Sequence, residues 1–261
     1  SSDLIHATGD IRDFTPDERT TLIQALERGD LTFAKAKKLL KLKSKAVTFT
    51  SGQYGQFEVP AYGKVKEKTM RAYSISSPPS DKTHLEFLIR LVPGGIVTTY
   101  VHEQLQEGQK LRLVGPFGDF YVRDTSAQMI CVAGGSGMAP FKSIFQDMLD
   151  HGTLDDRDIW YFFGARTKKD VYYLDWLYKL DEEHERFHFV PALSEPQPED
   201  NWDGPTGLIT EVLDSYLKGT ISQETPKEGY LCGSPGMLDA CMKVMGDNDM
   251  ESDKIYFDKF A

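Results

Sequence analysis

A glycine-rich turn, Gly134-Gly135-Ser136-Gly137-Met138-Ala139-Pro140, separates two segments of different pattern. The apolar run before it, residues 129–133, predicts a buried strand, and apolar residues after Pro140 recur at helical spacing. Backbone N–H groups and the helix dipole at such a strand-to-helix turn favour anions, so the turn could cradle a pyrophosphate. The alternative is that the glycines only permit tight packing of the strand against the helix.

Two further segments carry residue types suited to a phosphate-linked aromatic cofactor. Arg71-Ala72-Tyr73-Ser74 combines a cation for phosphate, an aromatic face for a flavin-type ring and a hydroxyl that can hydrogen-bond near the ring's reactive nitrogen. Downstream, Gly94-Gly95-Ile96-Val97-Thr98 suits a second phosphate cradle at the start of a helix predicted over residues 98–105. Two phosphate-binding elements therefore precede a turn of the nicotinamide-binding type.

The elements around the glycine turn alternate between short apolar runs and helical patterns. Strands are predicted over residues 129–133, 159–163, 187–193, 229–232 and 254–257. Helices are predicted after Pro140 and over residues 171–180, 208–217 and 237–245. This alternation predicts an α/β fold with a doubly wound, parallel, five-stranded sheet. Ligands of such a sheet are expected at the carboxyl ends of the strands, where the strand order reverses.

The N-terminal half has a different pattern, with alternating runs at residues 86–92 and 110–114 separated by Pro and Gly turns. That pattern predicts antiparallel β structure closed into a barrel. Alternating Leu and Lys over residues 40–45 predict another strand, whose lysines are interpreted as a solvated face rather than a docking patch.

The first 30 residues and the domain boundary are placed from capping and turn signals. Thr15-Pro16 and Glu18 resemble a capping box before a short helix that would stop at Gly29, and a strand is the competing interpretation. The barrel domain is assigned to residues 1–124, with an N-terminal extension, and the α/β domain to residues 125–261.

Charge and composition argue against several classes of function. The 40 acidic and 30 basic residues give a formal charge of −10, whereas a nucleic-acid partner needs a basic face. Three cysteines are too few for a disulfide framework or a four-cysteine iron–sulfur site, and the six histidines lack metal-ligand spacing, so no metal is expected. No apolar run approaches the roughly 20 residues of a spanning helix. With no secretory signal at its start, the chain is expected in the cytoplasm.

Seven short motifs follow one another along the chain: Arg71 to Ser74, Gly95 to Thr98, Gly115-Pro116-Phe117-Gly118, Gly134 to Pro140, Phe163-Gly164-Ala165-Arg166, Cys232-Gly233 and Asp258-Lys259-Phe260. In this order they resemble the ferredoxin-NAD(P) reductase superfamily. The stretch from Ala192 to Gly207 is most similar to two of its groups. These are the flavin subunit of the sodium-pumping NADH:quinone oxidoreductase and the reductase components of multicomponent oxygenases, both of which normally carry a plant-type ferredoxin domain ahead of the barrel.

The resemblance implies an FAD-binding barrel, an NAD-binding α/β domain, and a reductase that passes electrons from NADH through FAD to a one-electron acceptor. The acceptor would be an iron–sulfur protein, or a domain ahead of this chain, and a place beside a membrane complex is left open. The implied catalytic residues are Tyr73, Ser74 and Cys232. The implied cofactor-binding residues are Arg71, Ala72, Tyr73, Ser74, Arg90, Gly94, Gly95, Val97, Thr98, Gly134, Gly135, Ser136, Gly137, Met138, Gly164, Arg166, Ser194, Glu195, Cys232, Gly233, Ser234, Pro235, Met237 and Phe260. Many relatives have Cys-Gly-Pro-Pro where this chain has Cys232 to Pro235, and the alternative for Cys232 is a small buried residue at a strand end.

Two rival functions fit the same motifs: an NADPH-dependent ferredoxin or flavodoxin reductase, and a non-catalytic flavin-binding subunit. Relatives that use NADPH tend to place an arginine beside the residue matching Ser194, where this chain has Glu195. A carboxylate there would repel a 2′-phosphate and could accept hydrogen bonds from ribose hydroxyls. Three nearby cations, Arg166, Lys168 and Lys169, argue for NADPH instead. The alternative is that they form an exposed basic turn that serves the pyrophosphate of either cofactor. We predict NADH.

Overall fold

The computed structural model describes residues 4–7, 37–43, 47–106 and 108–259. The chain forms two compact units, Ser1–Tyr121 with Ala139–Asp147 and Val122–Met138 with Met148–Ala261. The helix predicted from Thr15 to Gly29 lies outside the described residues. The predicted domain boundary after residue 124 stays a prediction.

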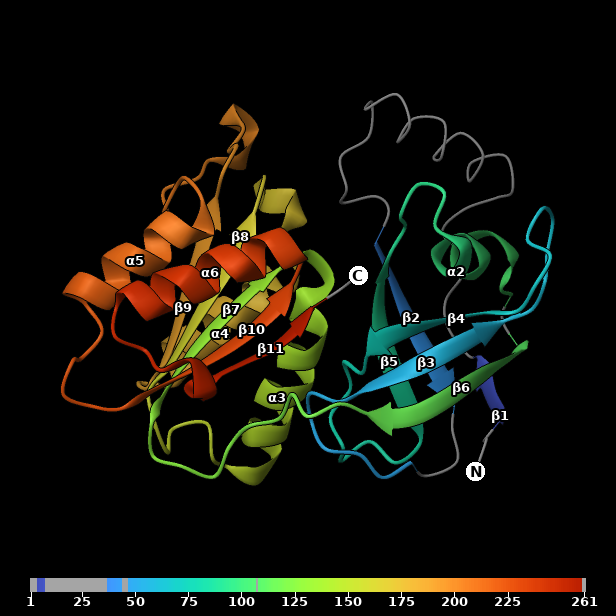
Figure 1. Cartoon of the computed structure of the whole chain (residues 1–261), viewed down its shortest axis with the longest axis horizontal. Helices are drawn as coiled ribbons and strands as arrows, with labels where there is room; N and C mark the ends of the chain where they lie inside the picture. Colours follow the sequence, from blue (N-terminus) through green and yellow to red (C-terminus); the bar gives the residue numbers. More distant parts are fainter. Residues whose placement is uncertain (1–3, 8–36, 44–46, 107, 260–261) are drawn as a thin grey trace. The chain divides into compact units, whose positions relative to one another are not determined.

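The first unit is built on a six-stranded antiparallel sheet (Figure 1). In sheet order its strands are β4 (Thr69–Ser74), β3 (Tyr54–Val59), β6 (Lys110–Phe117), β1 (Leu4–Ala7), β2 (Lys37–Lys43) and β5 (His84–Arg90). Just after β4, Ile75 bridges to Phe87 of β5, and the Ser76 amide donates to the Glu86 carbonyl oxygen at 2.7 Å. The two ends of the sheet therefore meet, and the predicted antiparallel barrel is confirmed.

One end of the barrel carries a short helical segment. Helix α2 (Ile96–Thr99) is capped by Gly95 and continues as a π-helical turn, Tyr100–Gln104. Val97 and Val101 from this segment are buried in the same apolar cluster as the strand residue Phe57. The helix predicted over residues 98–105 is thus confirmed, with a start two residues earlier.

The second unit is a five-stranded sheet in which every neighbouring pair is parallel. In sheet order its strands are β11 (Ile255–Lys259), β10 (Lys227–Gly233), β7 (Gln128–Gly134), β8 (Ile159–Ala165) and β9 (Phe187–Leu193). The order reverses at β7, which pairs with β8 on one side and with β10 on the other. All five strands coincide with the predicted apolar runs to within two residues at either end, and the predicted doubly wound sheet is confirmed.

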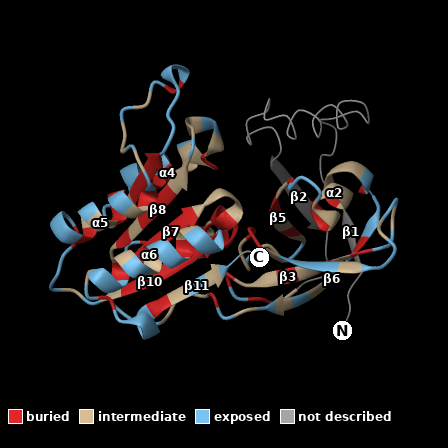
Figure 2. Ribbon diagram, turned by 45° about the horizontal axis from the view of Figure 1, so that its top comes forward, coloured by how far each residue is buried: buried red, intermediate tan, exposed pale blue. Residues whose placement is uncertain are grey.

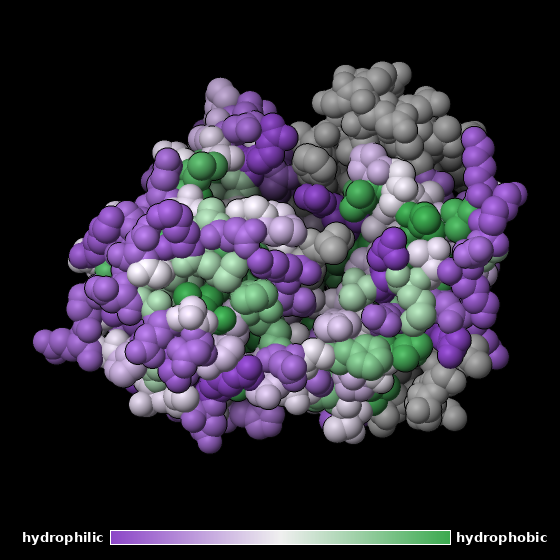
Figure 3. Space-filling view, viewed as in Figure 1, coloured by the Kyte–Doolittle hydropathy of each residue, from purple (hydrophilic) through white to green (hydrophobic). Residues whose placement is uncertain are grey.

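Helices α5 (Ile209–Gly219) and α6 (Pro235–Asp247) pack side by side on one face of this sheet (Figures 1 and 2). Their apolar residues form one core with Ile130, Val132 and Phe162 of the strands beneath them. Hydrophilic side chains cover most of the outer surface of α5, whereas the surface over α6 mixes hydrophilic and apolar residues (Figure 3). This division follows from the helical spacing of apolar residues that predicted both helices.

Helix α4 (Leu174–Glu183) begins three residues later than the predicted start at residue 171. A capping box between Thr167 and Asp170 closes a 3₁₀ turn at Lys168–Asp170. Tyr173 then adopts the left-handed conformation, with φ of 52°, which a continuous helix does not allow. Apolar spacing alone carries no sign of this break.

Helix α3 (Met138–His151) follows the glycine turn, as predicted. Its central part, Ala139–Asp147, belongs to the first unit. There the Ser143 hydroxyl donates to the Ser77 carbonyl oxygen at 2.7 Å, and Phe141 packs edge-on against Phe120. Among the described residues, no helix is long and apolar enough to cross a membrane.

Candidate cofactor sites

The glycine turn lies where the strand order of the second unit reverses. Strand β7 ends at Gly134, a 3₁₀ turn spans Gly135–Gly137, and α3 starts at Met138. Gly135 has a φ of +56°, a conformation that favours glycine. A long helix that starts beside the point of reversal presents free N–H groups at the position where doubly wound sheets bind phosphates.

Gly137 is required by the closeness of the neighbouring strand. A Cβ atom on Gly137 would lie 2.1 Å from the carbonyl oxygen of Cys232 and 3.1 Å from the Gly233 nitrogen. The turn therefore runs directly over the end of β10, and its backbone is free of side chains at that point. The glycine at this position therefore serves the close approach of two backbones, and its predicted contact with a pyrophosphate stays a prediction.

Each of the three central strands has a glycine at or next to its end. Gly134 is the last residue of β7, Gly233 is the last residue of β10, and Gly164 is the last but one of β8. A Cβ atom on Gly134 or Gly233 would come within 2.8 Å of Met237 side-chain atoms, and one on Gly164 would lie 3.0 Å from Ile209 Cβ. These glycines therefore do serve tight packing, the alternative weighed from the sequence. The packing also places Met237 and Ile209 at the carboxyl edge of the sheet. Ile209 was not among the site residues expected from the sequence motifs.

Cys232 lies completely buried beneath this edge. Burial raises the pKa of its thiol well above the usual range, and the negative charge of Asp258 acts in the same direction. The side chain is therefore a neutral thiol at physiological pH, and its predicted catalytic role stays a prediction. Met138 is buried as well, and its sulfur accepts a hydrogen bond from Tyr161 at 2.9 Å.

The remaining predicted residues near this edge are more accessible. Ser136 is half-buried in the turn, whereas Ser234 and Pro235 are exposed at the start of α6. Ser194 is exposed after β9. Phe260 lies outside the described residues.

Arg166 and Glu195, which were expected to have opposite effects on cofactor choice, form an ion pair. The Arg166 guanidinium nitrogen lies 2.6 Å from a Glu195 carboxylate oxygen, and both side chains are more than half exposed. This contact holds the pKa of Glu195 below its usual range and raises that of Arg166. The two charges therefore compensate each other at the carboxyl ends of β8 and β9.

Lys168 is also held in this region. Its backbone amide and its side-chain amine both bind Asp200, at the Oδ2 atom and the carbonyl oxygen respectively, each at 3.3 Å. Asp200 is buried and also accepts a hydrogen bond from the Gln197 amide at 2.9 Å. The loop after β9 is thus tied to the loop after β8, a role for Asp200 that its place in a polar loop did not reveal.

In the first unit, Arg71 and Tyr73 alternate onto one face of β4, while Ala72 and Ser74 occupy the other. The Tyr73 ring packs against Phe57, with ring centroids 5.1 Å apart. Burial raises the pKa of the Tyr73 hydroxyl to about 12, and the charge of Arg71 lowers it only in part. Arg71 and Ala72 are exposed, and Ser74 is buried. The motif thus offers an accessible cation beside a half-buried ring.

Helix α2 packs against β4, so the two predicted FAD-binding elements come together. Gly94 has a φ of +70°, and a Cβ atom on Gly95 would lie 2.5 Å from the Thr98 hydroxyl oxygen. That hydroxyl accepts a hydrogen bond from the Val92 amide at 3.2 Å. The Gly95 amide donates to the Val92 carbonyl oxygen at 2.9 Å. Since the Val97 side chain is buried in the barrel core, Val97 would contact a phosphate through its backbone N–H group. Arg90 is half-buried at the end of β5.

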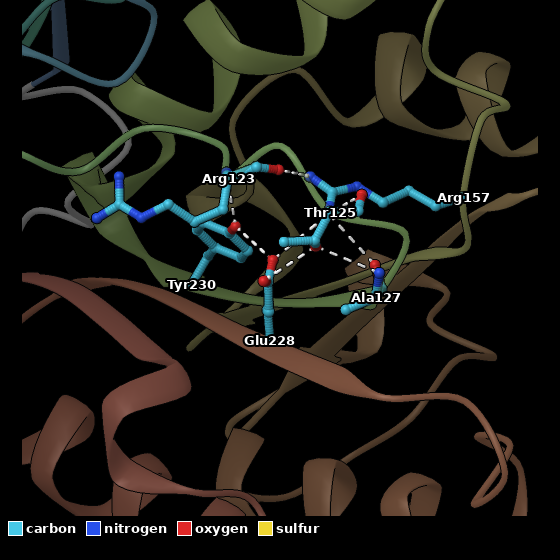
Figure 4. Close-up of polar contacts among 6 residues, drawn as sticks. All are labelled: Arg123, Thr125, Ala127, Arg157, Glu228 and Tyr230. Carbon is cyan, nitrogen blue, oxygen red and sulfur yellow. Dashed lines mark hydrogen bonds and ion pairs between the residues drawn. The ribbon is translucent and has the colours of Figure 1, made fainter.

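A buried polar cluster lies at the opposite, amino-terminal edge of the parallel sheet (Figure 4). Arg157 lies 3.4 Å from Glu228 and donates to the carbonyl oxygens of Arg123, Thr125 and Ala127. Tyr230 donates to Glu228 at 2.8 Å. This cluster fixes residues 123–127 to the second unit and was not identified from the sequence. Among the described residues, no group of His, Cys, Asp and Glu could hold a metal ion.

Comparison with known proteins gives matches for both units. Residues 32–121 match the oxidoreductase FAD-binding domain, and residues 131–243 match the oxidoreductase NAD-binding domain. The chain belongs to the ferredoxin reductase-like family. It therefore carries the FAD-binding and NAD-binding domains of a family of oxidoreductases.

Individual members of the family cover most of this chain. One component of a Na⁺-translocating NADH-quinone reductase from Marinomonas is 36% identical over 88% of this chain and 64% of its own length. The electron transfer component of a xylene/toluene monooxygenase from Pseudomonas putida is 36% identical over 83% of this chain and 59% of its own length. The chain thus spans less than two thirds of each of these relatives. A crystal structure of an Amycolatopsis cytochrome P450 reductase superposes with a TM-score of 0.77 at 25% identity, and the match covers all of this chain and 70% of that one.

Proposed function

We propose that this chain oxidises NADH, uses bound FAD to accept the hydride, and delivers electrons one at a time to an iron–sulfur protein or domain. The observation that carries the proposal is that one chain holds two elements suited to binding a cofactor, one in each unit. The Arg71 to Ser74 motif lies against α2 in the barrel, and the glycine turn lies at the reversal point of the parallel sheet. The relatives, a component of a quinone reductase and an electron transfer component of a monooxygenase, support the same chemistry.

The flavin would supply the conversion from a two-electron donor to one-electron release, and the protein would supply binding and orientation. Arg71 would hold the FAD pyrophosphate through its guanidinium group. The half-buried ring of Tyr73 would pack against the flavin, and Ser74 would offer a hydroxyl near its reactive edge. The backbone N–H groups of the Gly134–Gly137 turn would bind the NADH pyrophosphate. Hydride transfer needs distance and orientation rather than a general acid or base, which agrees with a site made mostly of binding residues.

NADH rather than NADPH is the proposed donor because the Glu195 carboxylate would repel a 2′-phosphate and could accept hydrogen bonds from ribose hydroxyls. The nearest arginine, Arg166, is already paired with Glu195. We also propose that the protein lies in the cytoplasm, with a place beside a membrane complex left open.

Anaerobic titration of the purified protein with NADH tests the proposal. We expect a yellow protein whose absorbance near 450 nm bleaches on addition of about one equivalent of NADH per flavin, because the reduced flavin loses that band. Subsequent addition of an oxidised plant-type [2Fe–2S] ferredoxin should restore the colour. A yellow protein that neither NADH nor NADPH bleaches would instead be a non-catalytic flavin-binding protein, and faster bleaching by NADPH would overturn the donor assignment.

A further inference from the structure

Strand β9 lies at one edge of the parallel sheet and pairs along its length with β8. Its sequence is Phe-His-Phe-Val-Pro-Ala-Leu, so His188 carries the only polar side chain in it. Free N–H and C=O groups on such an edge form a template on which another strand can pair. A short apolar segment of low charge and high β propensity also associates readily with copies of itself. The hydrogen bonds along this edge therefore determine whether the sheet ends at β9.

The N–H groups at the two ends of β9 are already bound. Phe187 donates to the His184 carbonyl oxygen at 3.0 Å, and Leu193 donates to the Pro205 carbonyl oxygen at 3.1 Å. The Leu193 carbonyl oxygen in turn accepts from the Gly207 amide at 3.0 Å. Both acceptors lie outside β8, so these N–H groups point away from it. Successive residues of a strand direct their N–H groups to opposite sides, so the outward series is formed by alternate residues.

The two middle positions of that outward series are 189 and 191. The Phe189 amide donates to the Oδ1 atom of Asp181 at 3.0 Å. Pro191 has no N–H group, which is why proline is tolerated on an edge strand. Along this strand, which the structure describes in full, each outward N–H group is thus either bound within the chain or absent.

Asp181 is held beside β9 by the packing of α4. Leu177 and Leu180 of this helix are buried, and the Tyr178 ring lies edge-on to the Phe189 ring with centroids 5.3 Å apart. The Asp181 side chain is exposed, but a carboxylate forms a charge-assisted hydrogen bond with a backbone N–H group. It is therefore a stronger acceptor for this amide than the neutral carbonyl group of an arriving strand.

We propose that the β9 edge is a latent interface between two copies of this chain and that Asp181 and Pro191 keep it closed. Two copies related by a two-fold axis would pair their β9 strands antiparallel and join two five-stranded sheets into one. No Asp, Glu, Lys or Arg occurs in the strand, so no such charges oppose each other in this pair. With the axis at Val190, position 189 of each copy lies opposite position 191 of the other. The central pairing then needs the two N–H groups that Asp181 binds and that Pro191 lacks.

The test restores these two donors one at a time. Asp181→Ala frees the Phe189 amide, Pro191→Ala supplies an N–H group at position 191, and the double variant does both. Asp181→Asn is the matched control, because it removes the same negative charge while its amide oxygen still accepts a hydrogen bond. The comparison separates loss of the acceptor from loss of charge repulsion between two acidic copies.

Sedimentation equilibrium of the complete chain measures self-association, and hydrogen exchange of residues 187–193 reports whether β9 is the interface. We expect the double variant to associate at least about tenfold more tightly than the wild-type protein, because each restored donor is used twice in a two-fold pair. Its β9 amides should become more protected as the protein concentration rises. Asp181→Asn should match the wild-type protein in both measurements.

Unchanged association of the folded double variant, or association without concentration-dependent protection of β9, would overturn the proposal. Equal association of Asp181→Asn and Asp181→Ala would do the same, because charge and not the hydrogen bond would then be the barrier. Should the double variant fail to fold, Pro191→Ala alone decides the matter. A smaller shift in the same direction in both measurements is expected for this single variant, and no shift counts against the latent interface.

Discussion

Gly137 and Cys232 are in direct backbone contact, so close that a Cβ atom on Gly137 would lie 2.1 Å from the Cys232 carbonyl oxygen. The contact joins the turn after β7 to the end of β10, the two strands between which the sheet order reverses. Neither partner is a flexible side chain, so an added methyl group could be accommodated only by moving the main chain. The position of the predicted pyrophosphate cradle therefore depends on this one glycine.

We expect Gly137→Ala to weaken NADH binding strongly and to lower the melting temperature, because the turn must move away from β10. The matched control is Gly246→Ala in α6, where a Cβ atom would meet nothing within 4 Å. In that helix the change should be neutral, or stabilising by up to about 1 kcal/mol. Titration with NADH and thermal unfolding of both variants give the comparison. Wild-type affinity and melting temperature in Gly137→Ala would contradict the contact.

Arg71→Ala should reduce FAD retention, because the exposed guanidinium of the β4 motif is the proposed partner of the FAD pyrophosphate. A loss of about 2 kcal/mol, equivalent to roughly thirtyfold in affinity, is expected for one charge-assisted contact. The control is Arg112→Ala, which removes an exposed arginine of the same sheet. Its partner Glu58 is still paired with Lys68, 3.1 Å away, after this change. Flavin absorbance after gel filtration measures retention. Equal retention by the two variants would show that Arg71 does not hold the cofactor.

Tyr73 makes the stability of the first unit depend on pH above 10. Its pKa is raised by burial from an ordinary value of 10.0 to about 12. Below pH 10 both the folded and the unfolded chain keep the proton, so the stability contribution is fully present. Between pH 10 and about 12 the unfolded chain loses the proton while the folded chain keeps it, and stability falls as pH rises.

Tyr73→Phe should therefore lose less stability than the wild-type protein across that alkaline window. Urea unfolding at pH 8, 10 and 11, followed by the fluorescence of bound flavin, measures the difference. Other buried tyrosines, such as Tyr161 and Tyr230, are present in both proteins and cancel in the comparison. Parallel stability curves for the two proteins from pH 8 to 11 would show that Tyr73 is not the group responsible.

The parallel sheet could be predicted because each strand is covered on both faces and reads as a short, continuous apolar run. Residues 129–133 and 187–193 identified β7 and β9 for this reason. The start of α4 could not be predicted, since the left-handed conformation of Tyr173 has no counterpart in apolar spacing. The local pattern of apolar residues thus predicts which helices and strands are present more accurately than it predicts the residues at which they begin and end.

The candidate site residues likewise include some that the sequence predicts and some contacts that it does not. The glycine turn could be identified because its chemistry resides in one contiguous segment between a strand and a helix. The pairing of Arg166 with Glu195 could not, although both residues had been singled out, because it depends on the β8–β9 register across 29 residues of chain. Two residues that were expected to oppose each other in cofactor choice prove to be partners.

The Arg157–Glu228 pair was not identified from the sequence because its partners come from separate segments of the chain. Both side chains are about 95% buried, and Glu228 also receives hydrogen bonds from Tyr230 and Thr125. Removing one partner leaves the other as a buried charge with incomplete compensation, which typically costs about 3–5 kcal/mol. Removing both costs less than the sum of the two single changes, because no buried charge is then left behind.

We therefore expect Arg157→Met to lower the free energy of unfolding of the second unit by about 3–5 kcal/mol. Glu228→Gln should cost less, because Arg157 keeps its three backbone carbonyl acceptors and glutamine still accepts a hydrogen bond from Tyr230. The double variant should be more stable than the sum of the single variants predicts. The control is Lys218→Met, which breaks an exposed ion pair with Asp214 of 2.7 Å and should cost less than about 1 kcal/mol. Urea unfolding followed by far-ultraviolet circular dichroism gives all four values. Strict additivity of the two single changes would mean that Arg157 and Glu228 are not energetically coupled.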